Sequence, residues 1–295
     1  MNTSRRDFLK YSAMLGSGIL FRLPDSIAIV SEATKFLEKI GVCTGISNNG
    51  ILATAGYSYV EESVRSFLVP AEDEAAFQSK MASLKDSKIP VEACNNFIAG
   101  TLKSVGPAAV HDDILKFAET AFRRAQIAGV KTIVFGSGGS RSIPAGFPAN
   151  EARDQFISLC KKMGPLAGKY DVVISLEPLN KGECNFINSV AEGGEIVKAV
   201  NHKNFMLLAD LYHMLREKES PENIIKYKDL LYHTHIAENA GRTAPGVNKE
   251  DFTPYFKALK EAGYPGRMSI ECSWKSLAEQ AGPALLEMRR QLKGI

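Results

Sequence analysis

Four short stretches in the second half of the chain decide the fold: VVISLEP (172–178), FMLLADL (205–211), LLYHTHI (230–236) and RMSIECS (267–273). Each is an apolar run of strand length that leads into a polar or charged residue. Four similar stretches precede them: KIGVCTGI (39–46), YSYVEES (57–63), VEACNNF (91–97) and KTIVFGS (131–137). The sequence therefore predicts eight strands.

Amphipathic stretches with apolar residues at helical spacing separate these strands. The clearest of them cover residues 71–87, 108–129, 151–170 and 276–294. Strands that alternate with helices indicate βαβ units and a parallel sheet. Eight such units in about 260 residues predict an α/β fold, a single-domain (β/α)8 TIM barrel. A doubly wound open sheet is the main alternative, but no GxGxxG motif follows an early strand to favour its dinucleotide-binding form.

The N-terminus has the pattern of an export signal. SRRDFLK (4–10) places two arginines before the apolar run YSAMLGSGILF (11–21), and RLPDSIA (22–28) follows. The apolar run is too short to span a bilayer stably, and the double arginine is similar to a twin-arginine signal. We therefore expect residues 1–28 to be a twin-arginine-type signal peptide, residues 29–295 to form the barrel, and the protein to be exported to the periplasm. An amphipathic first helix is the alternative.

Composition and charge limit the class of protein. Of 295 residues, 45% are hydrophobic and 23% are charged, as in soluble globular enzymes. The net charge is +3, and residues 1–28 account for +2 of it, which leaves +1 for the remainder. A nearly neutral body gives no reason to expect a nucleic-acid partner. Five cysteines without a CxxC pair argue against a disulfide framework or a zinc knuckle.

Polar residues at the ends of the last four strands form a candidate metal site. In TIM barrels, functional side chains lie at the carboxyl ends of the strands. The last four strands end with Glu177, Asp210, His235 and Glu271, spaced by about one βα unit each. Three carboxylates and one imidazole suit a hard divalent ion, Mn²⁺ first, with Mg²⁺ or Co²⁺ as alternatives. Any one of these residues alone would more often be a paired structural group.

Residues 170–275 resemble the sugar isomerase/epimerase superfamily with a xylose isomerase-like TIM barrel, and in particular the D-tagatose and D-psicose 3-epimerases. The resemblance lies in ISLEPLNKGEC (174–184), LLADLYHM (207–214), HTHIAENAGRTAPG (233–246) and MSIEC (268–272). It implies that the metal ligands are Glu177, Asp210, His235 and Glu271. It also implies that Glu183, His213 and Arg242 contact the substrate.

The resemblance implies a divalent-metal-dependent sugar epimerase or isomerase that acts on a free ketose or keto-sugar. Glu177 and Glu271 would transfer a proton beside the carbonyl, through an enediolate that the metal stabilises. The same deprotonation could expel a leaving group, so a lyase that cleaves 3-keto-glycosides or C-glycosides is the alternative. The expected partner is a small sugar, with no nucleic acid and no stable membrane span, and a homo-oligomer is compatible with the resemblance.

Two other functions fit the sequence less well. A three-metal endonuclease needs more than the five histidines present, and a non-catalytic sugar-binding barrel would not need the intact glutamate pair.

Glu61 is predicted either to contact a distal hydroxyl or to pair with a cation. His233 is expected to pack below the metal, and the loop GSGGSR (136–141) to be a bent loop rather than a phosphate cradle. Trp274 is expected at a sugar-binding wall or at the barrel rim.

Overall fold

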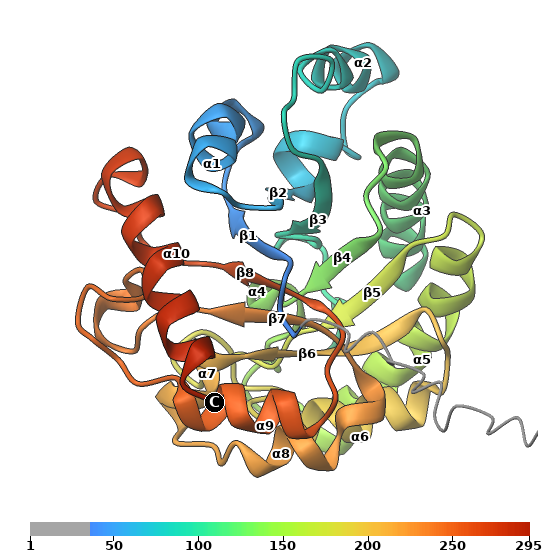
Figure 1. Ribbon diagram of the computed structural model, residues 1–295. Coiled ribbons are helices and arrows are strands. Elements are labelled where there is room, and N and C mark those ends of the chain that lie inside the picture. The colour runs from blue at the N-terminus through green and yellow to red at the C-terminus, as the bar shows by residue number, and fades with distance from the viewer. Residues whose placement is uncertain (1–35) are drawn as a thin grey trace, which may run out of the picture. The chain divides into compact units, whose positions relative to one another are not determined.

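A computed structural model describes residues 36–295, so the expected signal peptide, residues 1–28, and the first residues of the expected barrel lie outside the described residues. Eight parallel strands form a closed barrel in which each strand pairs with the next and β8 pairs with β1 (Figure 1). The strands are β1 Ile40–Cys43, β2 Tyr59–Ser63, β3 Val91–Asn95, β4 Thr132–Phe135, β5 Val173–Leu176, β6 Phe205–Asp210, β7 Leu231–Ile236 and β8 Arg267–Ile270. The predicted (β/α)8 barrel is confirmed, and the open sheet is excluded.

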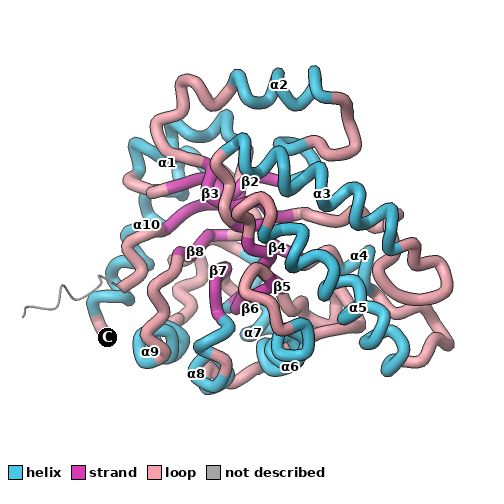
Figure 2. Tube along the Cα trace, turned by 90° about the vertical axis from the view of Figure 1, so that its right-hand side faces the viewer, coloured by secondary structure: helices cyan, strands magenta, loops and turns pink. Residues whose placement is uncertain are grey.

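Helices surround the strands, as Figures 1 and 2 show from two directions. The α-helices are α1 Asn49–Ala55, α2 Glu74–Ala82, α3 His111–Ala128, α4 Gly138–Arg141, α5 Ala149–Gly168, α6 Val190–Val200, α7 Leu211–Glu217, α8 Glu222–Lys226, α9 Thr253–Glu261 and α10 Leu277–Lys293. Short 3-10 or π turns cover Ile46–Asn48, Val64–Leu68, Lys228–Leu230 and Ala240–Arg242. Among the described residues, no helix combines the length and the apolar character that crossing a membrane requires.

The long helices pack on the barrel because their apolar residues recur on one side. In α3, Ile114, Ala118, Phe122 and Ala125 are buried at intervals of three or four residues. Phe122 contacts Phe97, which lies just beyond the end of β3, with ring centres 5.6 Å apart. Aromatic contacts of this kind add about 0.5–1.5 kcal/mol beyond the area they bury. Such packing fixes the carboxyl ends of the strands, where the candidate site lies.

Candidate active site

Four side chains from β5, β6, β7 and β8 converge at the carboxyl end of the barrel. Glu177 directly follows β5, Asp210 ends β6, His235 is the last residue but one of β7, and Glu271 directly follows β8. One donor atom of each lies within 4.8 Å of the others. His235 Nδ1 is 3.0 Å from Glu177 Oε1 and 3.3 Å from Glu271 Oε2. The structure thus brings together the four residues expected to form one group.

The charges within this group match the needs of a divalent cation. Asp210 Oδ1 accepts the N–H groups of Tyr212 and His213 at the start of α7, at 2.7 and 3.4 Å. Asp210 Oδ2 is buried and has no hydrogen-bond partner. A buried carboxylate oxygen without a partner is unfavourable, so a cation at this point would offset the cost. Burial and the negative charge of Glu271 raise the pKa of Glu177, which shows the mutual repulsion of the carboxylates.

Beneath the group, Glu61 holds two histidines in the fully buried interior of the barrel. Glu61 Oε1 is 3.0 Å from His235 Nε2, and Glu61 Oε2 is 2.8 Å from His233 Nε2 and 2.6 Å from Ser269 Oγ. Burial alone would raise the pKa of Glu61, but the two histidines outweigh it and hold that pKa well below its usual value. With Nε2 of His235 directed at Glu61, Nδ1 faces the carboxylates. Glu61 is expected either to contact a distal hydroxyl or to pair with a cation. The structure supports pairing, with His233 and His235 as the partners.

His233 lies where the sequence places it, below the group of four and against Glu61. It contributes to the support of His235 rather than to the group itself. The role of Glu61 is harder to predict, because a glutamate in a strand carries no pattern that marks it as the partner of a histidine 174 residues away.

Glu271 is held by two donors on different sides of its carboxylate. Asn95 Nδ2, from the end of β3, donates to Glu271 Oε1 at 2.8 Å. Asn96 Nδ2 donates to Asn95 Oδ1 at 2.9 Å, which fixes the orientation of the Asn95 amide. Arg242 Nη2 donates to Glu271 Oε2 at 2.6 Å. Burial alone would raise the pKa of Glu271, but His235 and Arg242 outweigh it and lower that pKa to about 2.

Among the residues expected to contact a substrate, His213 has a donor that makes no hydrogen bond. Its Nδ1 accepts the backbone N–H of Asn180 at 3.1 Å, so its proton is on Nε2. Nε2 is buried, makes no hydrogen bond, and lies 3.5 Å from Asp210 Oδ2. A buried N–H without a partner beside the four converging residues is suited to bind an oxygen of a ligand.

Arg242 and Glu183 close another side of the site. Arg242 Nη1 lies 3.3 Å from Glu183 Oε1, and the guanidinium lies 4.7 Å from the centre of the Tyr212 ring. Asn180 Nδ2 donates to Glu183 at 2.9 Å. Burial alone would lower the pKa of Arg242, but the surrounding carboxylates raise it, so Arg242 stays charged. The structure thus brings His213, Arg242 and Glu183 to the same end of the barrel as the group of four.

A cavity of about 270 Å³ lies at this end of the barrel. Glu177, Glu183, Arg242 and Glu271 line it, together with the glycine-rich loop at 136–139. A Cβ atom on Gly136 would collide with Glu177 Oε2, so the loop passes close to Glu177 only because this residue is glycine. The expected bent loop at 136–141 is only partly confirmed, because its last four residues form the short helix α4. Trp274 packs against the hydrophobic core and does not line this cavity. Of its two expected positions, the structure therefore favours the barrel rim over a sugar-binding wall.

Residues 50–293 match the xylose isomerase-like TIM barrel family. The chain belongs to this family. Family membership confirms the resemblance inferred from the segments that carry the four converging residues. The matched residues run from the second residue of α1 to the last residue of α10, so they include seven of the eight strands.

Among the curated proteins similar to this chain are two sugar epimerases. L-ribulose 3-epimerase of Methylomonas sp. is 27% identical over 223 residues, which cover 74% of this chain and 75% of that protein. 3-Dehydro-D-guloside 4-epimerase of Escherichia coli is 32% identical over 107 residues, which cover 36% of this chain and 40% of that protein. The chain therefore matches three quarters of one relative and two fifths of the other.

Solved structures of two epimerases share the fold. D-psicose 3-epimerase from Clostridium cellulolyticum superposes with a TM-score of 0.75 at 20% identity, over 86% of this chain and 99% of that chain. The 3-keto-D-glucoside 4-epimerase from E. coli gives a TM-score of 0.71 at 21% identity, over 85% and 99%. At these identities the likeness concerns the barrel alone.

Proposed function

We propose that this protein is a divalent-metal-dependent sugar epimerase that transfers a proton beside the carbonyl of a free ketose or keto-sugar. The observation that carries the proposal is the convergence of Glu177, Asp210, His235 and Glu271, in which the buried Oδ2 of Asp210 has no hydrogen-bond partner. The names of the relatives, which are ketose and keto-glycoside epimerases, support the same chemistry.

The four converging residues would hold the ion. When bound, a divalent ion would act as a Lewis acid that stabilises negative charge developing on the sugar oxygens. Carboxylate oxygens and one imidazole nitrogen suit Mn²⁺, with Mg²⁺ or Co²⁺ as alternatives. Glu61 would keep His235 Nδ1 available by accepting the proton of Nε2.

Glu177 and Glu271 would move the proton. The two carboxylates directly follow β5 and β8, lie 3.0 and 3.3 Å from His235 Nδ1, and both line the cavity. One carboxylate removes the proton from the carbon beside the carbonyl, and the other returns a proton to the opposite face, which inverts that carbon. Asn95 and Arg242 orient Glu271 for this transfer.

His213, Arg242 and Glu183 would bind the sugar. His213 Nε2–H and the Arg242 guanidinium can donate to sugar oxygens, and Glu183 can accept from a hydroxyl. A cavity of about 270 Å³ is small for a ligand site and suits a single sugar ring rather than an oligosaccharide. We also propose, from the sequence, that the protein is exported to the periplasm and has no nucleic-acid partner. A homo-oligomer is compatible with the resemblance.

Product analysis tests this function. The purified protein is stripped of metal, reloaded with Mn²⁺, Mg²⁺ or Co²⁺, and incubated with ketohexoses and with 3-keto-glycosides. A new epimer that forms only with metal supports the proposal, and Glu271→Gln should abolish it. Release of the aglycone from a keto-glycoside would assign the lyase reaction to the same site. Failure to bind any divalent ion would contradict the metal-dependent function.

A further inference from the structure

A buried carboxylate outside the group of four and outside the cavity lining lies in the loop after β7. Glu238 is fully buried, two residues beyond the end of β7. Its Oε1 accepts the backbone N–H groups of Gly246 and Glu250, at 2.8 and 3.3 Å. Its Oε2 accepts the backbone N–H of Asn248 and, at 2.8 Å, the hydroxyl of Thr243. All four donors are uncharged, so hydrogen bonds from this one loop stabilise the buried charge.

The same loop is closed on itself around Arg242. The backbone N–H of Glu238 donates to the carbonyl of Thr243 at 2.9 Å, so these two residues bracket Arg242. Asn248 Nδ2 donates to Thr243 Oγ1 at 2.7 Å and ties the returning part of the loop to the same point. Between Glu238 and Thr243, Gly241 and Arg242 have φ angles of 69° and 50°. Glycine adopts this left-handed region freely, but arginine does so only where its surroundings impose it.

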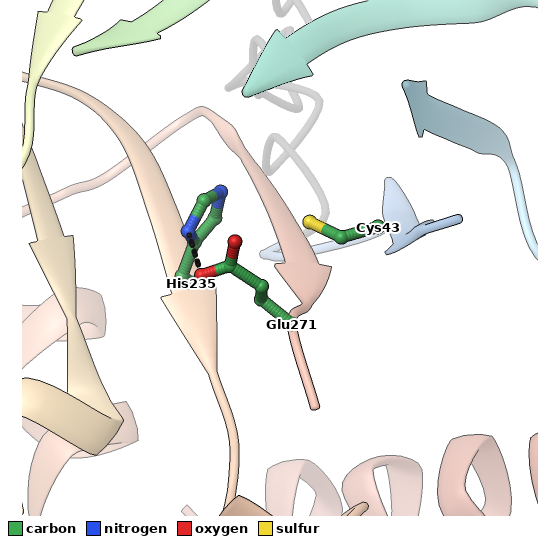
Figure 3. Close-up of side chains that lie close together, drawn as sticks. All are labelled: Cys43, His235 and Glu271. Atoms are coloured by element: carbon green, nitrogen blue, oxygen red, sulfur yellow. Dashed lines mark ion pairs between the residues drawn. The ribbon is translucent and has the colours of Figure 1, made fainter. Parts of the chain in front are cut away.

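This backbone conformation places the Arg242 guanidinium against Glu271. The Arg242 carbonyl accepts the backbone N–H of Ser273 at 2.7 Å, which joins the loop to the chain beyond β8. The side chain reaches Glu271 twice, because Nε donates to the backbone carbonyl at 3.2 Å and Nη2 donates to Oε2 at 2.6 Å. Glu271 Oε2 also lies 3.3 Å from His235 Nδ1, the ion pair drawn in Figure 3. One carboxylate oxygen therefore contacts both the guanidinium and the imidazole.

These contacts run from Glu238 through the backbone of the loop to Arg242 and Glu271. Resting on the proposed function above, we propose that Glu238 is a positioning residue that holds Arg242 in place to contact Glu271 and the sugar. A carboxylate is required for this role. Each of its oxygens accepts two donors, whereas glutamine would turn an NH₂ group toward one of the two pairs. At least one buried backbone N–H of the loop would then lose its partner.

The Arg242 Nε–H group reports its own position without reference to activity. Its resonance in a proton–nitrogen correlation spectrum is assigned by its absence in Arg242→Gln, and its exchange with water is measured in the metal-loaded protein. Because Nε–H donates to the Glu271 carbonyl, we expect slow exchange in the wild type. In Glu238→Gln the exchange should become roughly tenfold faster, the scale of losing one hydrogen bond to a charged group.

A double-mutant cycle tests whether Glu238 acts through Arg242. Glu238→Gln should lower kcat/KM about 100-fold, the scale on which misplacement by about 1 Å acts, and should lower the Mn²⁺ affinity less. Arg242→Gln should lower kcat/KM at least as far, and adding Glu238→Gln to it should cause no further loss.

Glu219→Gln is the matched control. Glu219 also accepts backbone N–H groups, those of Val190 and Ala191 at the start of α6, and it does not line the cavity. This variant should keep the wild-type kcat/KM and the wild-type exchange of Arg242 Nε–H. If Glu238→Gln does not fold, Thr243→Val takes its place, because it removes one of the four donors and should speed the exchange to a smaller extent.

The outcomes separate this proposal from the proposed function. Losses of kcat/KM that multiply in the double variant, or an Nε–H exchange that is unchanged in Glu238→Gln, would overturn the positioning role and leave the epimerase function standing. Unchanged exchange in Thr243→Val, where that variant is the one used, would do the same. A wild type without epimerase activity, in which Glu238→Gln still speeds the exchange, would contradict the proposed function and support the positioning of Arg242.

Discussion

Glu61 and His235 lie 3.0 Å apart, Oε1 to Nε2, and both side chains are fully buried. This contact joins β2 to β7 across the interior of the barrel and directs Nδ1 of His235 toward the carboxylates. The residue that orients the imidazole therefore comes from the half of the chain that contributes none of the four converging residues.

Replacing Glu61 is expected to weaken metal binding. In the wild type, the two carboxylate oxygens of Glu61 contact His233, His235 and Ser269. Glutamine at this position has only one acceptor oxygen for these three partners. We expect Glu61→Gln to lower the affinity for divalent ions by roughly 10–100-fold, measured by calorimetric titration. Glu61→Ala should also lower the free energy of unfolding by about 3–5 kcal/mol, because it breaks a buried charged network. An unchanged metal affinity in Glu61→Gln would contradict the orienting role.

Asn95 is expected to act by positioning Glu271. Asn95→Ala removes the 2.8 Å hydrogen bond to Glu271 Oε1 and should lower kcat/KM by roughly 10–100-fold, as loss of a ligand's supporting residue does. Asn95→Asp should be more harmful, because it places a second negative charge against Glu271. Steady-state kinetics and Mn²⁺ affinity are measured together. If Asn95→Asp were as active as the wild type, Asn95 would have no positioning role.

Gly136 is expected to be required for the placement of Glu177. The backbone conformation there is open to other residues, but the alanine methyl would collide with Glu177 Oε2. We expect Gly136→Ala to reduce kcat about 100-fold, the scale on which misplacement by about 1 Å acts. The matched control is Gly50→Ala in α1, where no atom beyond the chain neighbours lies within 4 Å of the new methyl. That control should keep full activity and gain about 0.5–1 kcal/mol in stability. Equal activities of the two variants would contradict the steric argument.

Acid stability is expected to depend on Glu287, which lies away from the site. Hydrogen bonds from Arg290 lower the pKa of Glu287 from 4.5 to about 2. Because the pKa is lower in the folded state, the stabilisation is complete above pH 4.5 and is lost as the pH falls toward 2. Arg290 is 70% exposed, so the contribution stays below about 1 kcal/mol. We expect the free energy of unfolding of Glu287→Gln, measured with urea, to fall less between pH 4.5 and about pH 2 than that of the wild type.

Export is expected to require the two arginines. Arg5→Lys combined with Arg6→Lys keeps the charge but alters the motif that the twin-arginine receptor reads. We expect the double variant to remain in the cytoplasm while the wild type reaches the periplasm, as seen by fractionation and immunoblotting. The matched control Lys10→Arg should leave export intact. Equal export of the double variant and the wild type would contradict a twin-arginine signal.

The strands and the converging residues could be predicted for one physical reason. Strands buried on both faces read as continuous apolar runs, so their ends are visible in the sequence. Because strand ends in a barrel meet at one rim, the polar residues there can be grouped from the sequence alone. Asp210 and His235 follow directly from that rule.

The support beneath the site could not be predicted in the same way. Glu61 and Glu62 are adjacent in β2, and the register of β2 and β3 shifts between Val60 and Glu61. Such a shift changes which neighbour faces the interior, so strand alternation does not decide between the two glutamates. Asn95 also ends a strand, but an amide does not stand out as a carboxylate does.

Proton exchange with solvent tests the central claim most directly. The metal-loaded protein and Glu271→Gln are incubated in D₂O with a ketose or keto-sugar, and proton NMR follows the carbon beside the carbonyl. The proposed function predicts that deuterium enters this position, that a new epimer forms, and that both require the metal and Glu271. A new epimer formed without deuterium incorporation, or exchange that is unchanged in Glu271→Gln, would contradict proton transfer by the glutamate pair.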